Sequence, residues 1–299
     1  MSHGRILSEK HKIFERQEGL MQKRVAAIHD ISCFGRCSLT VALPVISAAG
    51  IETAVIPTAL LSTHTGGFKN YVFKDLTEYI LPVANHWKSE KIQADTVYTG
   101  YLGSKEQVEI VKEAQRIIRK KSSLLLVDPV MADFGKLYGG FDSDFPEFMK
   151  KLCLVADVIT PNITEACFLT QTEYLNPPFK KEYIVKLLKR LKSLTKAQIV
   201  LTGVSFDKKK TGVACFDGIS ESYILSGAVN ASFHGTGDVF ASVLTAAMTK
   251  GKDLLKSAEI AEKFTVKSIK RTLRSTPLLR YGLNFEEELP YLIKQLNKH

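Results

Sequence analysis

Residues 25–58 read VAAIHDISCFGRCSLTVALPVISAAGIETAVIPT. The stretch begins with a short apolar run (25–30), continues with a longer run typical of a helix (38–50), and returns to an apolar run rich in β-branched residues (53–58). Gly50 stands where a helix commonly ends. A strand, a helix and a second strand in this order predict two parallel strands with a helix packed against them.

The same alternation continues to the end of the chain. Further strands are predicted at 95–100, 123–130, 155–162 and 197–203, helices at 74–91, 104–121, 163–170 and 181–194, and a hairpin over 211–227 before three final helices. Such alternation predicts a mainly parallel central sheet with helices on both faces. No linker or repeat divides the chain, so we expect one α/β domain over residues 24–299 after an N-terminal extension over residues 1–23.

The composition is that of an ordinary globular protein. Hydrophobic residues make up 45% and charged residues 24%, and no apolar run reaches the roughly 18 residues of a membrane span. The first residues lack an apolar signal core and the five cysteines are odd in number, which predicts free thiols in the cytoplasm. The net charge of +10 leaves a nucleic-acid-binding protein as a remote alternative. However, the densest basic run (250–274) interleaves with an apolar stripe typical of a solvated helix face, so we expect neither a nucleic-acid nor a membrane partner.

Polar residues follow several predicted strands at the point where each strand ends. They are Asp30, Asp128, Asn162 and Thr202. In open parallel sheets these ends share one edge, and ligands bind there. A single residue of this kind is commonly a turn former, but four of them at one edge indicate a crevice that carries chemistry.

The segment FHGTGDVF (233–240) stands directly before an apolar run typical of a helix. Flexible glycines allow the N–H groups of Gly235, Thr236 and Gly237 to face one point, where the helix N-terminus adds about half a positive charge. That arrangement suits a transferring phosphoryl group, and Asp238 would accept a proton from an attacking alcohol. The alternative is a plain turn before a capped helix. The motifs of P-loop ATPases and of dinucleotide-binding proteins are both absent.

A second group of oxygen ligands comes from DPVMAD (128–133) and PNITE (161–165). Asn162 and Glu165, three apart at a helix start, present an amide and a carboxylate on one face, as a Mg²⁺ site would require. The alternative is a capping box, in which the same two side chains satisfy backbone N–H groups.

A third group is the loop LSTHTGGF (61–68), which follows a strand. Its hydroxyls, imidazole and paired glycines suit a mobile substrate-binding loop, and they suit a loop without function equally well. His64 and His234, taken alone, are more commonly structural or solvent-facing than ligands.

Together these residues resemble the ribokinase-like superfamily, and specifically its vitamin-kinase branch. The resemblance covers residues 24–298 and rests on GTGD (235–238), N-x-x-E (162–165), DPVMAD (128–133) and TGY (99–101). The stretch STHTG (62–66) is similar to the S-N-H-T-G loop of pyridoxal kinases. Sugar kinases of the superfamily carry a small β lid early in the chain. Here the first strand leads straight into its helix, so no separate lid domain is expected.

The resemblance implies a role for each position. Asp238 is implied as the general base, and the amides of Gly235, Thr236 and Gly237 as the anion hole. The other implied positions are Asn162 and Glu165 around Mg²⁺ through water, Asp128 and Asp133 near the cation and the phosphates, Thr202 near the ATP phosphates, and His64, Thr65 and Tyr101 around a pyridine ring. ATP as co-substrate, a homodimer and an effect of K⁺ are implied as well.

One position departs from the pyridoxal kinase pattern. Those kinases commonly have Q-S-H after the first strand, where this chain has His29-Asp30-Ile31. A carboxylate at Asp30 could pair with a protonated pyridine nitrogen more strongly than a hydroxyl does. The expected reaction is ATP-dependent phosphorylation of the 5′-hydroxymethyl group of pyridoxal, pyridoxine or pyridoxamine. Hydroxymethylpyrimidine kinase, from the thiamine pathway, is the alternative.

Overall fold

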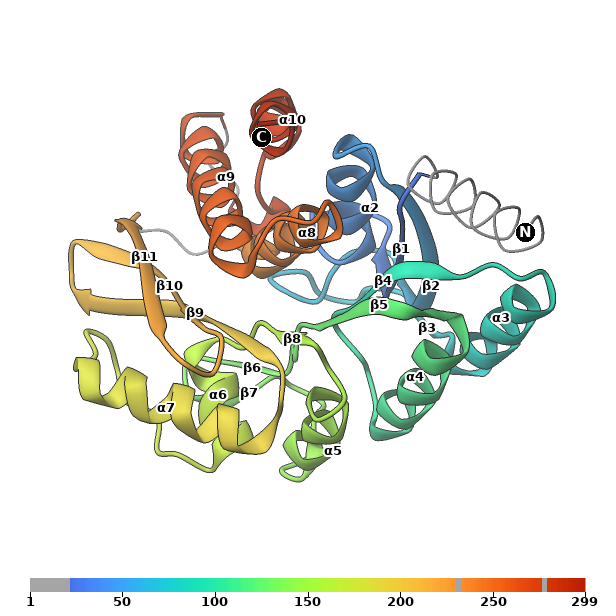
Figure 1. Cartoon of the computed structure of the whole chain (residues 1–299), viewed down its shortest axis with the longest axis horizontal. Helices are drawn as coiled ribbons and strands as arrows, with labels where there is room; N and C mark the ends of the chain where they lie inside the picture. The colour runs from blue at the N-terminus through green and yellow to red at the C-terminus, as the bar shows by residue number, and fades with distance from the viewer. Residues whose placement is uncertain (1–21, 230–232, 276–278, 299) are drawn as a thin grey trace, which may run out of the picture.

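A nine-stranded sheet forms the centre of the computed structural model, which describes residues 22–229, 233–275 and 279–298. Its strand order is β11-β10-β9-β8-β5-β4-β1-β2-β3 (Figure 1). The strands are β1 (Arg24–Ser32), β2 (Glu52–Leu61), β3 (Phe73–Asp75), β4 (Ala94–Thr99), β5 (Arg119–Val127), β8 (Val158–Ile159), β9 (Gln198–Asp207), β10 (Lys210–Phe216) and β11 (Glu221–Gly227). The six neighbouring strands β9, β8, β5, β4, β1 and β2 pair in parallel, whereas β3, β10 and β11 pair antiparallel at the two edges.

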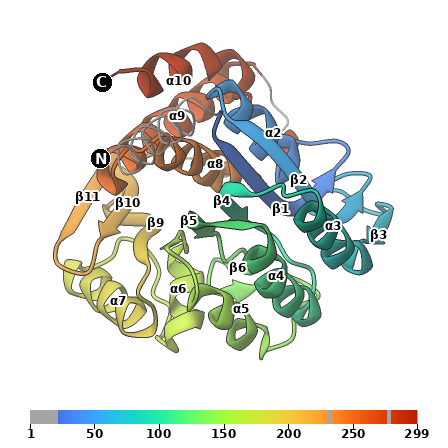
Figure 2. The same ribbon diagram turned by 45° about the vertical axis from the view of Figure 1, so that its right-hand side comes forward.

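Helices cover both faces of this sheet, as Figures 1 and 2 show. One layer holds α2 (Leu39–Ala48), α8 (Thr236–Thr249), α9 (Leu254–Ser275) and α10 (Leu289–Leu296); the other holds α3 (Thr77–Ser89), α4 (Lys105–Ile118), α5 (Phe145–Cys153), α6 (Ile163–Thr170) and α7 (Lys181–Leu194). Successive strand residues point to opposite faces, so Ala26 and Ile28 of β1 enter one core while Val25 and Ala27 enter the other. The predicted single α/β domain with a mainly parallel sheet is confirmed.

Several predicted boundaries were wrong. The predicted helix over 74–91 begins only at Thr77, because residues 73–75 form the edge strand β3 and the Asp75 carboxylate accepts a hydrogen bond from the Thr77 N–H (2.8 Å). The predicted strand over 155–162 shrinks to the two residues of β8. Pro161 has no N–H to donate, and pairing resumes as an isolated bridge between Asn162 and Thr202.

Some elements were not predicted at all. Helix α5 and a two-stranded hairpin of β6 (Ala132–Asp133) and β7 (Lys136–Leu137) lie within the segment that joins β5 to β8. The hairpin turn places Phe134 and Gly135 at φ 50° and 76°, the combination that a type I′ turn requires. The 3-10 turns η1 (Leu279–Tyr281) and η2 (Glu286–Glu288) precede α10.

The predicted extension over residues 1–23 lies outside the described residues except for its last two. Within the part of the chain that the structure describes, no helix is long and apolar enough to cross a membrane. Between β2 and α3 the chain contributes only the short edge strand β3.

Candidate active site

The start of α8 is open rather than capped by a side chain. Gly235 is its N-cap residue, at φ 77°, and the Thr236 hydroxyl donates backward to the Phe233 carbonyl (2.9 Å) instead of bonding to the helix. A Cβ at Gly235 would overlap the Arg36 carbonyl oxygen, so only glycine fits there. The first N–H groups of the helix therefore remain available to an anion, which favours the anion cradle over the plain capped helix.

Asp238 lies in the first turn of α8 and is half-buried. Burial raises the pKa of its carboxyl group to about 6, the N–H of Ser38 opposes this rise, and the nearby charge of Asp30 adds to it. A carboxyl group of this pKa is ionised at neutral pH, yet it is a stronger base than an ordinary aspartate. Both properties suit a general base.

Asp128 follows β5 and is buried. Burial, reinforced by the negative charge of Asp238, raises the pKa of Asp128 to about 8. Asp238 lies 110 positions further along the chain, so this charge effect on Asp128 arises only in the folded protein. Among the described residues neither of them forms an ion pair with a lysine, arginine or histidine.

Asn162 and Glu165 form the capping box. The Asn162 side chain accepts from the Glu165 N–H (2.9 Å), and the Glu165 carboxylate accepts from the Asn162 N–H (2.8 Å). The second oxygen of buried Glu165 accepts from the Met131 N–H (3.2 Å), and the Asn162 amide donates to the Ala132 carbonyl (2.8 Å). These side chains therefore brace the segment after Asp128 against α6, and their predicted role at Mg²⁺ stays a prediction.

The structure leads us to expect that Glu165→Gln destabilises the fold. The amide NH₂ of glutamine cannot accept a hydrogen bond, so one of the two backbone N–H groups loses its acceptor. Leaving such a donor buried costs about 1–3 kcal/mol in free energy of unfolding, measurable by urea denaturation. Exposed Glu113→Gln is the matched control, with a change within about 0.5 kcal/mol. An unfolding free energy that stays at the wild-type value in Glu165→Gln would contradict the capping-box role.

The other residues predicted around the phosphates lie near this box. Thr202 pairs with Asn162 across the sheet, and its N–H donates to the Pro161 carbonyl (2.9 Å). Asp133 is exposed in the β6–β7 hairpin, where its carboxylate accepts from the Phe134 N–H (2.9 Å).

Asp30 stands near the end of β1 and is only 5% exposed. One carboxylate oxygen accepts weakly from the Ser32 hydroxyl (3.4 Å), and the other, Oδ1, has no hydrogen-bond partner among the described residues. Burial raises the pKa of Asp30. Tyr101 is half-buried beside it, and burial together with the charge of Asp30 raises the pKa of Tyr101 to about 12. A buried oxygen without a partner is an acceptor prepared for a ligand.

The loop that contains STHTG is held by His64. The buried ring donates from Nε2 to the Arg280 carbonyl (2.7 Å), and its Nδ1 accepts from the Gly66 N–H (3.1 Å). The ring also packs edge-on against Phe68, and Arg280 lies over the Phe68 ring. His64 thus ties two loops together, whereas neighbouring Thr65 is exposed. Their predicted contacts with a substrate ring stay predictions.

Sequence reasoning missed three residues beneath and beside this site. His29 is buried in edge-to-face contact with Tyr98 (4.2 Å between ring centroids), and burial lowers the pKa of His29 to about 3. Both rings carry polar atoms without a hydrogen-bond partner among the described residues. Ser38 is the N-cap of α2 at φ 49°, and its side chain makes no capping hydrogen bond. The one sequence signal for Ser38 is its position directly before an apolar run typical of a helix.

An open helix N-terminus with a half-buried carboxyl group in its first turn, in a mainly parallel sheet covered by helices, fits a phosphotransferase of the ribokinase-like superfamily. The chain belongs to the phosphomethylpyrimidine kinase family, whose model matches residues 42–278. It is accordingly an ATP-dependent kinase.

Solved structures support this membership over nearly the whole chain. Pyridoxal kinase from Lactobacillus plantarum is 30% identical, with a TM-score of 0.85 over 93% of this chain and 100% of that protein. A Bacteroides thetaiotaomicron protein, assigned as a phosphomethylpyrimidine kinase and solved with pyridoxal, is 33% identical, with a TM-score of 0.84 over 91% of this chain and 96% of that protein. A thiamine biosynthetic bifunctional enzyme of Arabidopsis thaliana is 29% identical over 74% of this chain, which spans only 42% of that enzyme.

Proposed function

We propose that this kinase phosphorylates the 5′-hydroxymethyl group of a vitamin B6 vitamer, namely pyridoxal, pyridoxine or pyridoxamine. The observation that carries the proposal is the likeness to the Bacteroides thetaiotaomicron structure solved with pyridoxal. The Asp30 carboxylate adds to it, because a buried acceptor without a partner suits the N–H of a pyridinium ring.

The proposed reaction is a direct phosphoryl transfer. Asp238 accepts the proton of the substrate hydroxyl, and the hydroxyl oxygen bonds to the γ-phosphorus of ATP as the bond to the β–γ bridging oxygen breaks. ADP then leaves with that oxygen. The N–H groups of Gly235, Thr236 and Gly237 hold the negative charge of the transferring group in a fixed direction, which stabilises the transition state.

The carboxyl groups fit a magnesium ion that is shared with the nucleotide. In the described residues no three His, Cys, Asp or Glu side chains lie close enough to hold a metal by themselves. Burial and the charge of Asp238 nevertheless disfavour ionisation of Asp128, and among the described residues Asp128 has no ion-pair partner, so a divalent cation would favour its ionised form. Mg²⁺ commonly binds through one or two carboxylates, water and phosphate oxygens. When bound, it would neutralise charge on the phosphates, with Asp128 as its principal protein contact.

Further properties are proposed from the family alone. They are a homodimer, an effect of K⁺ on the rate and a cytoplasmic location.

The test of the proposed substrate is a panel of alcohols with ATP consumption as the readout. We expect at least one of the three vitamers to give a higher kcat/KM than hydroxymethylpyrimidine. An equal or higher kcat/KM with hydroxymethylpyrimidine would favour the alternative, a kinase of thiamine synthesis, which the likeness to the Arabidopsis enzyme supports.

Asp30→Ser should change the choice among vitamers. A hydrogen bond to a charged partner contributes about 1.5–3 kcal/mol, so losing it should lower kcat/KM for the preferred vitamer by about tenfold or more. The KM for ATP should stay within about twofold. Asp30→Asn is the matched variant, since it keeps the size while removing the charge and replacing one acceptor oxygen with an NH₂ donor. If the KM for ATP changes while vitamer selectivity does not, Asp30 belongs to the phosphate side of the site.

A further inference from the structure

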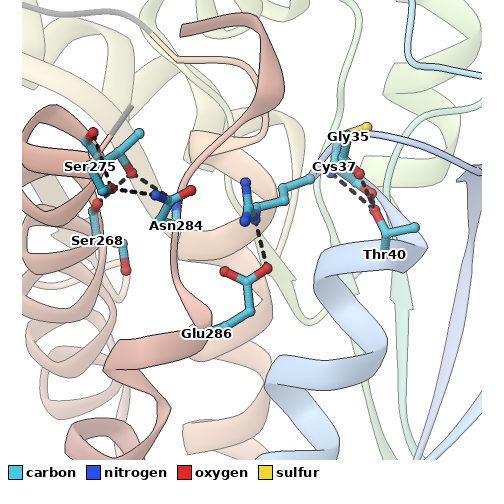
Figure 3. Close-up of polar contacts among 9 residues, drawn as sticks. Gly35, Cys37, Thr40, Ser268, Ser275, Asn284 and Glu286 are labelled. Carbon is cyan, nitrogen blue, oxygen red and sulfur yellow. Dashed lines mark hydrogen bonds and ion pairs between the residues drawn. The ribbon is translucent and has the colours of Figure 1, made fainter. Parts of the chain in front are cut away.

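Residues 280–286, the clamp segment, lie between α9 and α10 and are fixed to the body of the protein. The Phe285 side chain is buried in the core that the sheet shares with α8 and α9. The Asn284 N–H donates to the Thr272 hydroxyl of α9 (2.8 Å), and the Asn284 amide donates to the Ser275 hydroxyl (2.5 Å), as Figure 3 shows. The clamp segment therefore has a fixed position relative to α9.

The clamp segment holds the loop between β1 and α2 (residues 33–38). The Arg36 N–H donates to the Tyr281 carbonyl (3.2 Å). The Arg36 side chain pairs with Glu286, with 2.6 Å between Nε and Oε1 (Figure 3). A Cβ at Gly282 would come within 2.7 Å of the Arg36 carbonyl oxygen, so the two backbones are in direct contact.

The same loop lies against the start of α8. A Cβ at Gly235 would overlap the Arg36 carbonyl oxygen and come within 3.4 Å of the Cys37 Cα. The Thr40 hydroxyl donates to the Cys37 carbonyl (2.7 Å) and so keeps this part of the loop closed (Figure 3). The Arg36 carbonyl oxygen is therefore in contact both with Gly282 of the clamp segment and with Gly235 of the anion cradle. Because these contacts are close-packed, a displacement of Arg36 at the first glycine reaches the second.

The clamp segment also holds the STHTG loop (residues 61–68). The carbonyl of the residue before Tyr281 accepts from the His64 ring (2.7 Å), and the Tyr281 ring stacks on Phe68, with 6.2 Å between the ring centroids and 4° between the planes. The Tyr281 ring also meets Phe34 of the β1–α2 loop edge-on, with 5.2 Å between the centroids. Aromatic pairs at such separations are attractive. One side chain of the clamp segment thus contacts both loops.

We propose that the clamp segment positions two parts of the active site: it sets the anion cradle through Arg36 and the STHTG loop through Tyr281. This inference rests on the proposed function, in which the cradle binds the transferring phosphoryl group and the STHTG loop binds the vitamer. The contact with Arg36 should therefore control kcat, and the contact with the STHTG loop should control the KM for the vitamer. Tyr281 and Gly282 act through other residues, so they are positioning residues.

The first test compares Gly282→Ala with Gly251→Ala. The two glycines have nearly the same φ (83° and 84°), so both alanines are strained alike, but a Cβ at Gly251 would meet open space. Only Gly282→Ala forces Arg36 to move, and we expect its kcat to fall by about tenfold or more, because small misplacements of reacting groups are costly. Gly251→Ala should keep kcat within about twofold of wild type. Circular dichroism establishes that both variants are folded.

The second test adds no backbone strain. Tyr281→Leu removes the ring but keeps the carbonyl that holds Arg36, so the vitamer KM should rise by about fivefold or more while kcat stays within about threefold. Tyr281→Phe keeps the ring and should restore the wild-type vitamer KM. Tyr291→Leu is the matched control, because this half-buried tyrosine of α10 has its ring under Lys267 of α9 (4.8 Å from Nζ to the ring centroid), and it should leave the vitamer KM unchanged.

Two results would overturn the inference. They are a Gly282→Ala enzyme with the kcat of Gly251→Ala, and a Tyr281→Leu enzyme with the vitamer KM of Tyr291→Leu. Both results leave an active wild-type enzyme. A wild-type protein that phosphorylates no alcohol in the panel would instead overturn the proposed function, so the two failures are distinguishable.

Discussion

Asp238→Asn is expected to lower kcat by about 10²–10⁴, the usual effect of removing a positioned base, which corresponds to roughly 3–5 kcal/mol of barrier. Asparagine keeps the size of the side chain and is well tolerated near a helix start, so α8 should persist. Steady-state kinetics with saturating ATP and vitamer measure the effect, and a binding titration with ATP shows that the nucleotide site is intact. A folded variant that binds ATP and keeps more than about a tenth of the wild-type kcat would exclude Asp238 as the base.

The pH dependence of the wild-type enzyme tests the same assignment. Burial raises the pKa of Asp238 to about 6, and the base must be ionised to accept a proton. The value of kcat/KM should therefore be highest above this pKa and fall as the pH drops through about 6. A rate that stays constant down to pH about 4, near the ordinary pKa of aspartate, would contradict the assignment.

Gly235→Ala is the second change with a large expected effect. At φ 77° an alanine is strained, and its Cβ would overlap the Arg36 carbonyl, so the backbone has to move. The N–H groups of the anion cradle move with it, and loss of one such donor typically costs about 10²–10³ in kcat. The strain should also lower the free energy of unfolding by about 1–3 kcal/mol.

The control for this change is Gly139→Ala, because Gly139 is exposed and a Cβ there would meet open space. It should leave kcat and stability near the wild-type values. Kinetics and denaturation measured together separate the two effects of Gly235→Ala. A variant that loses stability but keeps kcat within about threefold would show that Gly235 serves packing alone.

Sequence alone was sufficient for the fold class, and it predicted the edge of the sheet at which the site should lie. Alternating strands and helices can produce few arrangements other than a parallel sheet covered on both faces, and the carboxyl ends of its strands share one edge. The sequence therefore predicts that Asp30, Asp128, Asn162 and Thr202 lie in one region. For the start of α8 the sequence left an anion cradle and a plain capped helix as alternatives, and the absence of a side-chain cap favours the cradle.

Only the tertiary structure determines which polar groups are buried and which residues far apart in the sequence come into contact. The effect of the Asp238 charge on the pKa of Asp128 depends on a distance that no local pattern encodes. The capping-box role of Glu165 could not be distinguished from that of a metal ligand by sequence spacing. The positive φ of Ser38 and the contacts that Thr40 and Glu286 make with its loop are likewise features of the tertiary structure alone. Sequence periodicity indicates which side of a helix or strand is apolar. The pKa and the orientation of a polar group depend instead on the neighbours that the tertiary structure places around it.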